Sequence, residues 1–269
     1  MINKVKKIVN ISYSKLFDLP LPWNTVELYE AACKAGFDGI KGDVTPSSDG
    51  KLIMCHDSVF KFDENGRVFE PGSKGVYSKQ ICDMTRDECK KLEYASEEAK
   101  EHLGYYPKVT ELEDLIKVCK KYDKFAYITV RDKQIQMCID EIYNLLKKYN
   151  MTNQCIVNSF TYETLKTMKE KDLDVLLSYV WGPEEPLTKE VVDRAIELGN
   201  CIVCVFLLDE EQYDDEIFEK SEQAVLYAKE KGVIVHFARA ENKEGYELGL
   251  KRGFTGFQCM KSDAFIINK

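Results

Sequence analysis

The 269-residue sequence contains no apolar segment near the length of about 18 residues that a membrane-spanning helix requires. Its first ten residues include lysines, but no apolar stretch or small-residue cleavage site follows, which argues against a signal peptide. A GxGxxG or Walker phosphate loop is also missing, so the sequence gives no support to a nucleotide-binding fold. These absences predict a cytoplasmic globular protein without membrane insertion.

The sequence also lacks a net positive charge and a convincing metal-ligand motif. The net charge is −8, which argues against nucleic acid and anionic membranes as partners because both attract basic proteins. Among ten cysteines only Cys201 and Cys204 have the CxxC spacing of a zinc site, and they lie in an apolar run that resembles a strand. Most of the others fall in apolar patterns too, as small buried residues do in a reducing compartment. A small-molecule partner is therefore expected, and the oligomeric state stays open.

The sequence does have a regular alternation of short and long apolar patterns. Short runs rich in β-branched residues alternate with longer amphipathic stretches, which is the pattern of βα units around a parallel sheet. The chain length suits one (β/α)₈ barrel, also called a TIM barrel. We therefore predict a single barrel domain over residues 1–269. Its eight strand candidates are residues 7–12, 37–44, 125–131, 155–159, 174–180, 201–207, 233–238 and 255–260.

Side-chain patterns also mark the expected ends of the helices. Three residue pairs fit the capping box that fixes a helix N-terminus: Asn24 with Glu27, Thr85 with Glu88, and Thr110 with Glu113. Glycines that follow helical stretches and precede strands are expected to end helices, namely Gly36, Gly199, Gly232 and Gly253.

The alternation is interrupted once, between the second and third strand candidates. Residues 57–107 contain several glycines and many charges, and they are too many for a plain connection in a compact domain. We predict that they form a small inserted subdomain or lid, which covers the barrel mouth and influences the choice of ligand.

One block of the sequence resembles a known enzyme family. Asp43-Val44, followed by Asp49-Gly50 and by His56-Asp57 after an apolar run, resembles the signature of the glycerophosphodiester phosphodiesterase family. There, a strand that ends in Glu-x-Asp-Val leads through Asp-Gly to an apolar run and His-Asp. Further similarities are Pro22 to Thr25 with Pro-Glu-Asn-Thr, Met84 to Leu92 with Leu-Thr-x-x-Glu-x-x-x-Leu, Tyr106 to Glu113 with Ile-Pro-Thr-Leu-Glu, Asn158 to Phe160 with Ser-Phe, and Gly253 to Phe257 with Gly-Val-Asp-Gly-Ile.

The resemblance spans nearly the whole chain and carries several implications. It implies an eight-stranded barrel with an inserted segment after the His-Asp pair, where the alternation is interrupted. It also implies a divalent cation, Mg²⁺ or Ca²⁺, and hydrolysis of glycerophosphodiesters to sn-glycerol 3-phosphate and an alcohol. Lipid metabolism is the context in which that reaction belongs.

Several site positions of the family hold other residues here. Where the family has His-Arg at the end of the first strand, this chain reads Ile11 to Ser14 and has neither residue. The first metal-binding Glu corresponds to Lys41, and the metal-binding Asp is kept as Asp43. At the end of the third strand the second metal-binding Glu corresponds to Thr129, and a phosphate-binding lysine corresponds to Arg131.

The charges at these positions favour an anion over a metal. Lys41 and Asp43 are two residues apart on a strand, as are Thr129 and Arg131, so each pair points to one face. Both pairs are expected at the carboxyl end of the barrel, where such folds place their chemistry. A hard cation needs several oxygen ligands, but here one carboxylate meets two permanent cations. Charges about 4 Å apart interact by about 4 kcal/mol at an effective dielectric of about 20, so we expect no cofactor unless Asp43 keeps the Mg²⁺ or Ca²⁺ of the family.

Three other residues complete the candidate site. His56 keeps its family context and is the candidate general acid or base. Tyr13 and Arg239 could bind a phosphate, as Lys41 and Arg131 could. His236 lies in a strand pattern that leaves open whether it faces the helices or the barrel interior.

Three functions are compatible with these residues. The first is a phosphodiesterase with a rearranged site, in which His56 transfers protons while Lys41 and Arg131 stabilise phosphoryl charge. The second is a non-catalytic barrel, or pseudoenzyme, that binds a phosphate ester or phosphodiester without metal. The third is a lyase-like enzyme with Lys41 as a Schiff-base nucleophile. The sequence leaves open whether the chain is an enzyme.

Overall fold

Eight parallel strands close into a barrel in the computed structural model, which describes residues 5–10, 18–70, 73–130, 135–182, 185–206, 215–238 and 243–259. The last strand pairs with the first, which completes the ring. Each strand begins within two residues of its predicted start, so the predicted (β/α)₈ barrel is confirmed. Around the barrel the strands are β1 (Lys7–Asn10), β2 (Gly39–Pro46), β6 (Phe125–Val130), β7 (Cys155–Ser159), β8 (Leu176–Trp181), β9 (Cys201–Phe206), β10 (Val235–Ala238) and β11 (Gly256–Cys259).

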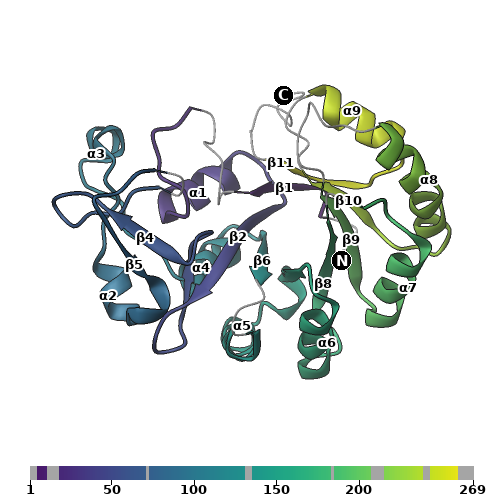
Figure 1. Ribbon diagram of the computed structural model, residues 1–269, viewed down its shortest axis with the longest axis horizontal. Coiled ribbons are helices and arrows are strands. Elements are labelled where there is room, and N and C mark those ends of the chain that lie inside the picture. The colour runs from purple at the N-terminus through teal and green to yellow at the C-terminus, as the bar shows by residue number, and fades with distance from the viewer. Residues whose placement is uncertain are drawn as a thin grey trace.

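Helices surround the barrel on its outer surface (Figure 1). They connect successive parallel strands, as a right-handed βαβ crossover requires. These helices are α1 (Val26–Lys34), α4 (Leu112–Lys121), α5 (Ile135–Tyr149), α6 (Tyr162–Lys171), α7 (Lys189–Leu198), α8 (Asp215–Glu230) and α9 (Lys243–Lys251).

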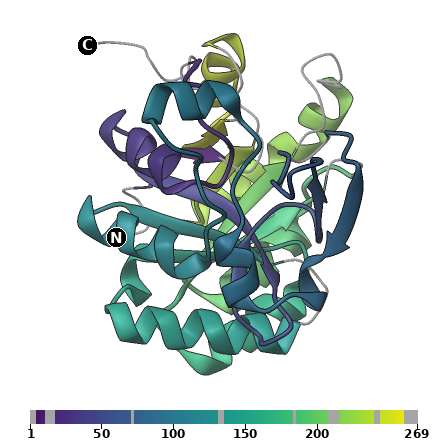
Figure 2. The same ribbon diagram turned by 90° about the vertical axis from the view of Figure 1, so that its left-hand side faces the viewer.

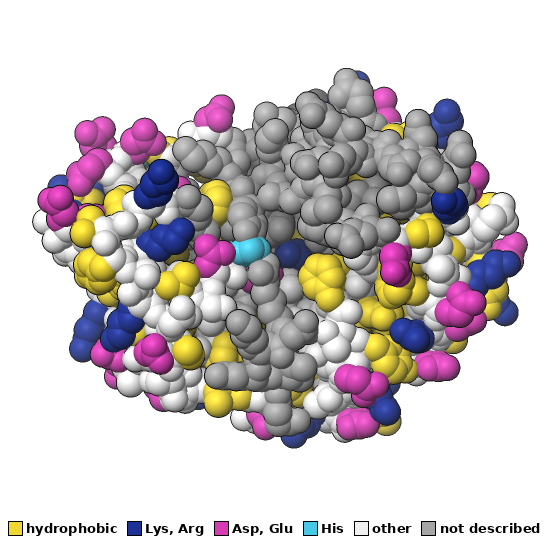
Figure 3. Space-filling model, in the orientation of Figure 1, with side chains coloured by type: hydrophobic (Ala, Val, Ile, Leu, Met, Phe, Trp, Pro, Cys, Tyr) yellow, Lys and Arg dark blue, Asp and Glu magenta, His cyan; other side chains and the backbone are white. Residues whose placement is uncertain are grey.

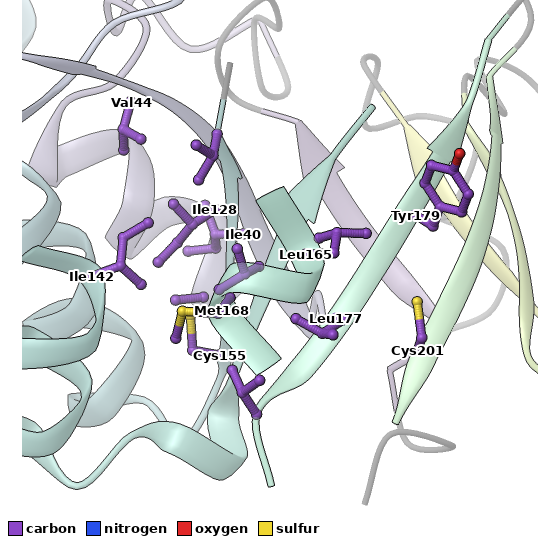
Figure 4. Packing of buried hydrophobic residues seen from close by; sticks show 14 of the residues in the cluster. Ile40, Val44, Ile128, Ile142, Cys155, Leu165, Met168, Leu177, Tyr179 and Cys201 are labelled. Atoms are coloured by element: carbon purple, nitrogen blue, oxygen red, sulfur yellow. The ribbon is translucent and has the colours of Figure 1, made fainter. Parts of the chain in front are cut away.

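The strands bury alternate residues in two separate layers. Outward residues such as Ile40, Ile128 and Leu177 pack against helix residues, among them Met168 of α6 (Figure 4). Inward residues form a second apolar cluster inside the barrel, which consists of Val5, Ile8, Phe125, Tyr127, Ile156, Leu176 and Ile202. Because side chains alternate between the faces of a strand, the positions two and four residues after an inward residue also point into the barrel.

The helix N-termini agree with one of the three predicted capping boxes. Thr85 and Glu88 cap α2 (Arg86–Lys91) reciprocally, as predicted. The other two N-caps lie one residue later than predicted, because α1 is capped by Thr25 and α4 by Glu111. Asn24 has a φ of 54°. Its carbonyl accepts a 2.6 Å hydrogen bond from the Thr110 hydroxyl, which is therefore not available as a cap. The four predicted helix-ending glycines all have positive φ.

The chain between β2 and β6 forms a small unit beside the barrel. Figures 1 and 2 show its elements gathered on the side nearest β2. Arg86 of this unit donates two hydrogen bonds to Glu111, the N-cap of α4. The unit's apolar cluster includes Phe60, Phe62 and Tyr94. Its role as a lid stays a prediction. Besides α2, its elements are β3 (Leu52–Met54), β4 (Val59–Phe62), β5 (Tyr77–Gln80), η2 (Ile81–Asp83) and α3 (Glu97–Leu103); a further short helix, η3 (Thr152–Gln154), precedes β7.

All ten cysteines are free thiols, and only Cys82 among them is exposed. The nine buried cysteines pack as small apolar residues, as the sequence predicts for most of the ten. Within the described ranges, the structure has no helix with the length and apolarity that crossing a bilayer would take.

His236 faces the barrel interior, which answers the question that its sequence pattern leaves open. It lies beside Gly256 on the neighbouring strand, and a Cβ at that glycine would come within 2.3 Å of the imidazole. The side chain is fully buried, and within the described part of the chain neither ring nitrogen has a hydrogen-bond partner of normal distance and angle. Burial lowers the pKa of His236 from 6.5 to about 4. The nearby Val5 backbone favours the charged imidazole and raises the pKa, but it offsets only part of the effect of burial.

We expect this histidine to make the protein less stable in acid. Above pH 6.5 it is neutral in both the folded and the unfolded chain, so it contributes no pH dependence. As the pH falls from 6.5 to about 4, the unfolded chain binds a proton that the folded chain does not, which lowers the free energy of unfolding by about 3 kcal/mol. Urea unfolding of the wild type and of His236→Phe at pH 7.5, 5.5 and 4.5 measures this contribution. Equal pH dependence in the two proteins would contradict it.

Candidate functional site

Lys41 and Asp43 lie together inside the barrel on β2. Their neighbours Ile40 and Val44 belong to the outer layer that packs against the helices, so both side chains point inward. The Lys41 Nζ and Asp43 Oδ1 atoms are 4.0 Å apart, and the two side chains are 12% and 2% exposed. This burial strengthens the attraction of the ammonium for an anion, because water screens the charge less.

Thr129 and Asn158 continue this inner wall on β6 and β7. Asp43 is in register with Thr129, and Thr129 is in register with Asn158. The Asn158 Nδ2 atom donates a 3.1 Å hydrogen bond to the Thr129 hydroxyl, and both side chains are buried. A neutral hydroxyl–amide pair thus lies directly beside the Lys41–Asp43 ion pair.

His56 reaches the same end of the barrel through the short strand β3. This strand runs antiparallel to β2, with Val44 opposite Met54, and the Cys55 amide donates a 3.1 Å hydrogen bond to the Asp43 carbonyl. The next residue, His56, is 17% exposed, and its Nδ1 atom is 2.8 Å from Asp57 Oδ1. Figure 3 shows a histidine side chain in a hollow near the middle of one face, with acidic and basic side chains beside it.

These residues do not fit a divalent cation. Mg²⁺ and Ca²⁺ are bound by several oxygen ligands, many of them carboxylates. Lys41 places an ammonium next to Asp43, and Thr129 offers a hydroxyl that already accepts a hydrogen bond. The part of the chain that the structure describes contains no group of three or more His, Cys, Asp or Glu side chains able to hold a metal.

The barrel interior contains a polar layer that the sequence does not predict. The Tyr127 hydroxyl donates a short hydrogen bond to Ser178, and the Gln258 Nε2 atom donates a 3.2 Å hydrogen bond to the Cys204 sulfur. Burial raises the pKa of Cys204 to about 12, so this thiol stays protonated at neutral pH and is a poor nucleophile. The signal in the sequence is an isolated polar residue at an inward position of an otherwise apolar strand, and it becomes visible only once the strand register is known.

The other predicted site residues lie outside the described part of the chain. Tyr13, Arg131 and Arg239 fall in stretches that the structure does not describe, so their part in a site stays a prediction. The side chains of Lys41, Asp43 and Thr129 all point into the barrel. The segment that precedes His56 lies beside them, because the Cys55 amide donates a hydrogen bond to the Asp43 carbonyl of β2.

One known protein family matches most of the chain. The profile of the glycerophosphoryl diester phosphodiesterase family matches residues 18–257, which include β2, β3 and β6. The chain belongs to this family.

Curated relatives in this family are distant. The glycerophosphodiester phosphodiesterase of Caldanaerobacter subterraneus subsp. tengcongensis is 25% identical over 170 residues, which cover 62% of this chain and 65% of that protein. Mouse glycerophosphodiester phosphodiesterase 1 is 22% identical over 163 residues, or 60% of this chain and 46% of the mouse protein. The chain thus matches between about half and two thirds of the length of these relatives.

Solved structures of family members share the fold over nearly the whole chain. A phosphodiesterase from Oleispira antarctica, in complex with the product sn-glycerol-3-phosphate, has a TM-score of 0.72 at 16% identity and covers 96% of this chain and 92% of its own. The glycerophosphodiester phosphodiesterase from Thermotoga maritima has a TM-score of 0.66 at 20% identity, with 97% and 95% covered. At these identities the likeness concerns the fold.

Proposed function

We propose that this family member binds a phosphate ester or phosphodiester inside its barrel without a divalent metal. The observation that carries the proposal is the position of the Lys41 ammonium on the barrel-facing side of β2, 4.0 Å from the Asp43 carboxylate. By the family resemblance, this residue stands where a metal-binding carboxylate would be. A fixed ammonium in a poorly hydrated site attracts phosphate oxygens in place of the cation.

Glycerol 3-phosphate and its diesters are the ligand class that we propose. The Oleispira antarctica structure holds sn-glycerol-3-phosphate, and its fold matches this chain over nearly the full length. We extend that ligand to this chain as a proposal. A cytoplasmic location also belongs to it, because ten free cysteines suit a reducing compartment.

A rearranged phosphodiesterase is the second candidate, and the contact of His56 with Asp57 favours it. A carboxylate 2.8 Å from Nδ1 orients an imidazole for proton transfer. One general acid or base accelerates a reaction by about 10²- to 10⁴-fold, whereas enzymes typically accelerate their reactions by about 10⁶-fold or more. The site would need further groups to hydrolyse a phosphodiester at a useful rate.

The Schiff-base function has the least support. Lysines that act in this way are activated by desolvation or by a neighbouring cation. Lys41 has a carboxylate as its neighbour instead.

Hydrolysis of glycerophosphocholine separates the binding protein from the enzyme. Product formation is measured for the full chain in EDTA and then with 5 mM Ca²⁺ or Mg²⁺ (about the concentration that saturates a weak site). We expect no metal-stimulated turnover and a rate close to the background. Strong stimulation by either ion would refute metal-independent binding as the function, because the chain would then recruit ligands from other positions.

A further inference from the structure

The amide of Asn158 carries a polar atom that is left without a partner in the described part of the chain. Asn158 is 1% exposed, and its Oδ1 atom has no hydrogen-bond partner among the residues that the structure describes. Buried polar side-chain atoms are normally paired, because an unpaired one costs about 1 to 3 kcal/mol. Such an atom in a barrel interior therefore calls for an explanation.

The position of Asn158 links this atom to the candidate site. Asn158, Thr129 and Asp43 are register neighbours on β7, β6 and β2, so Asn158 and Asp43 lie two strand spacings apart, or about 10 Å. The hydrogen bond to Thr129 holds the amide against the wall, so its other polar atom points away from Thr129. A ligand that contacts the Lys41–Asp43 pair and is about as long as a three-carbon chain with a phosphate would span this distance.

The chemistry of the amide indicates which group of the ligand contacts the remaining atom of Asn158. An amide has a donor end and an acceptor end of nearly equal shape, and either end can meet the Thr129 hydroxyl. A phosphate oxygen would suit only the donor end, and a cation only the acceptor end. A hydroxyl group both donates and accepts, so it satisfies the remaining atom in either orientation.

We propose that Asn158 is a specificity-determining residue that binds a hydroxyl group of the phosphate ester, and so selects a polyol phosphate over an alkyl phosphate. This inference rests on the proposed function. Folding has already removed Asn158 from water, so the new hydrogen bond requires no further desolvation of the protein. The atom has almost no exposed surface, so a ligand that reaches it must displace the side chains that cover it.

Two ligands that differ only in their hydroxyls test the inference. Glycerol 3-phosphate and n-propyl phosphate have the same carbon chain and phosphate, and calorimetry of the full chain compares their affinities. We expect the wild type to prefer glycerol 3-phosphate by about tenfold, as one hydrogen bond to a pre-desolvated group allows. Asn158→Leu should remove this preference and leave the affinity for n-propyl phosphate unchanged.

Thr164→Val is the matched control variant. Thr164 lies on α6, outside the barrel, and its buried hydroxyl likewise has no hydrogen-bond partner among the described residues. It should keep the full preference, and a lost preference there would overturn the inference because packing would then explain the effect. Equal loss of both ligands in Asn158→Leu would also overturn it, since the residue would only support the fold.

If Asn158→Leu does not fold, the wild type alone still tests the hydroxyl contact of Asn158 separately from the proposed binding of phosphate esters. Equal affinity for the two ligands would refute the hydroxyl contact and leave the proposed function standing. Binding of neither ligand would refute the proposed function, and the inference with it.

Discussion

Replacement of Lys41 by methionine is expected to weaken the binding of glycerol 3-phosphate by about 100-fold. Methionine keeps a long unbranched side chain but has no charge. Hydrogen bonds to a charged group contribute about 1.5 to 3 kcal/mol each, and a loss near the upper end corresponds to this change in affinity. Calorimetry at constant ionic strength measures the effect, because salt screens exposed charges and would blur the comparison.

Lys51→Met is the charge-matched control for this variant. Lys51 pairs with Glu141 across an outer groove at 3.0 Å, and its side chain is 46% exposed. The same loss of charge there should leave the affinity unchanged. If the lone Asp43 carboxylate in Lys41→Met disturbs folding, the double variant Lys41→Met, Asp43→Asn removes both charges and should still bind weakly. Wild-type affinity in either variant would show that Lys41 does not hold the ligand.

The double substitution Lys41→Glu, Thr129→Glu is expected to create a divalent-metal site. Asp43 and Thr129 are register neighbours, and residue 41 lies two positions before Asp43 on the same face, so three carboxylates would meet in the barrel interior. We expect Ca²⁺ to bind with a Kd of about 10⁻⁴ to 10⁻³ M, as in weak oxygen sites. Calcium at 100 times this Kd should stabilise the variant by about 2.7 kcal/mol, which is visible as a rise in Tm.

Two comparisons show whether the metal site forms as expected. Thr129→Glu alone should bind Ca²⁺ poorly, because the Lys41 ammonium would pair with the added carboxylate. The double variant should not hydrolyse glycerophosphocholine well, since the stretch from Ile11 to Ser14 contains neither the histidine nor the arginine of the family. If the Tm of the double variant does not depend on Ca²⁺, the side chains at positions 41, 43 and 129 do not converge on one site.

The fold was predictable because barrel strands are marked by composition over several residues. A strand such as Cys201–Phe206 is apolar on both faces, since one face packs on helices and the other lies inside the barrel. Glycines such as Gly36 and Gly253 were recognisable as well, because both end helices with a positive φ that other residues rarely adopt.

The details of the site depended on contacts that local sequence does not contain. Thr110 looks like a helix cap, but its hydroxyl bonds to Asn24, which lies 86 residues earlier in the chain. Asn158 looks like part of a short motif, and its pairing with Thr129 follows from the register of β6 and β7. Long-range register therefore decides which polar residues share the barrel interior, and a single sequence without structure does not specify it.

The most direct test of metal-independent binding is calorimetric titration of the full chain with glycerol 3-phosphate, first in EDTA and then in excess Ca²⁺ or Mg²⁺. We expect the same affinity in all three conditions, because the Lys41 ammonium takes the place of the ion beside Asp43. Binding that appears only after the ion is added would contradict it.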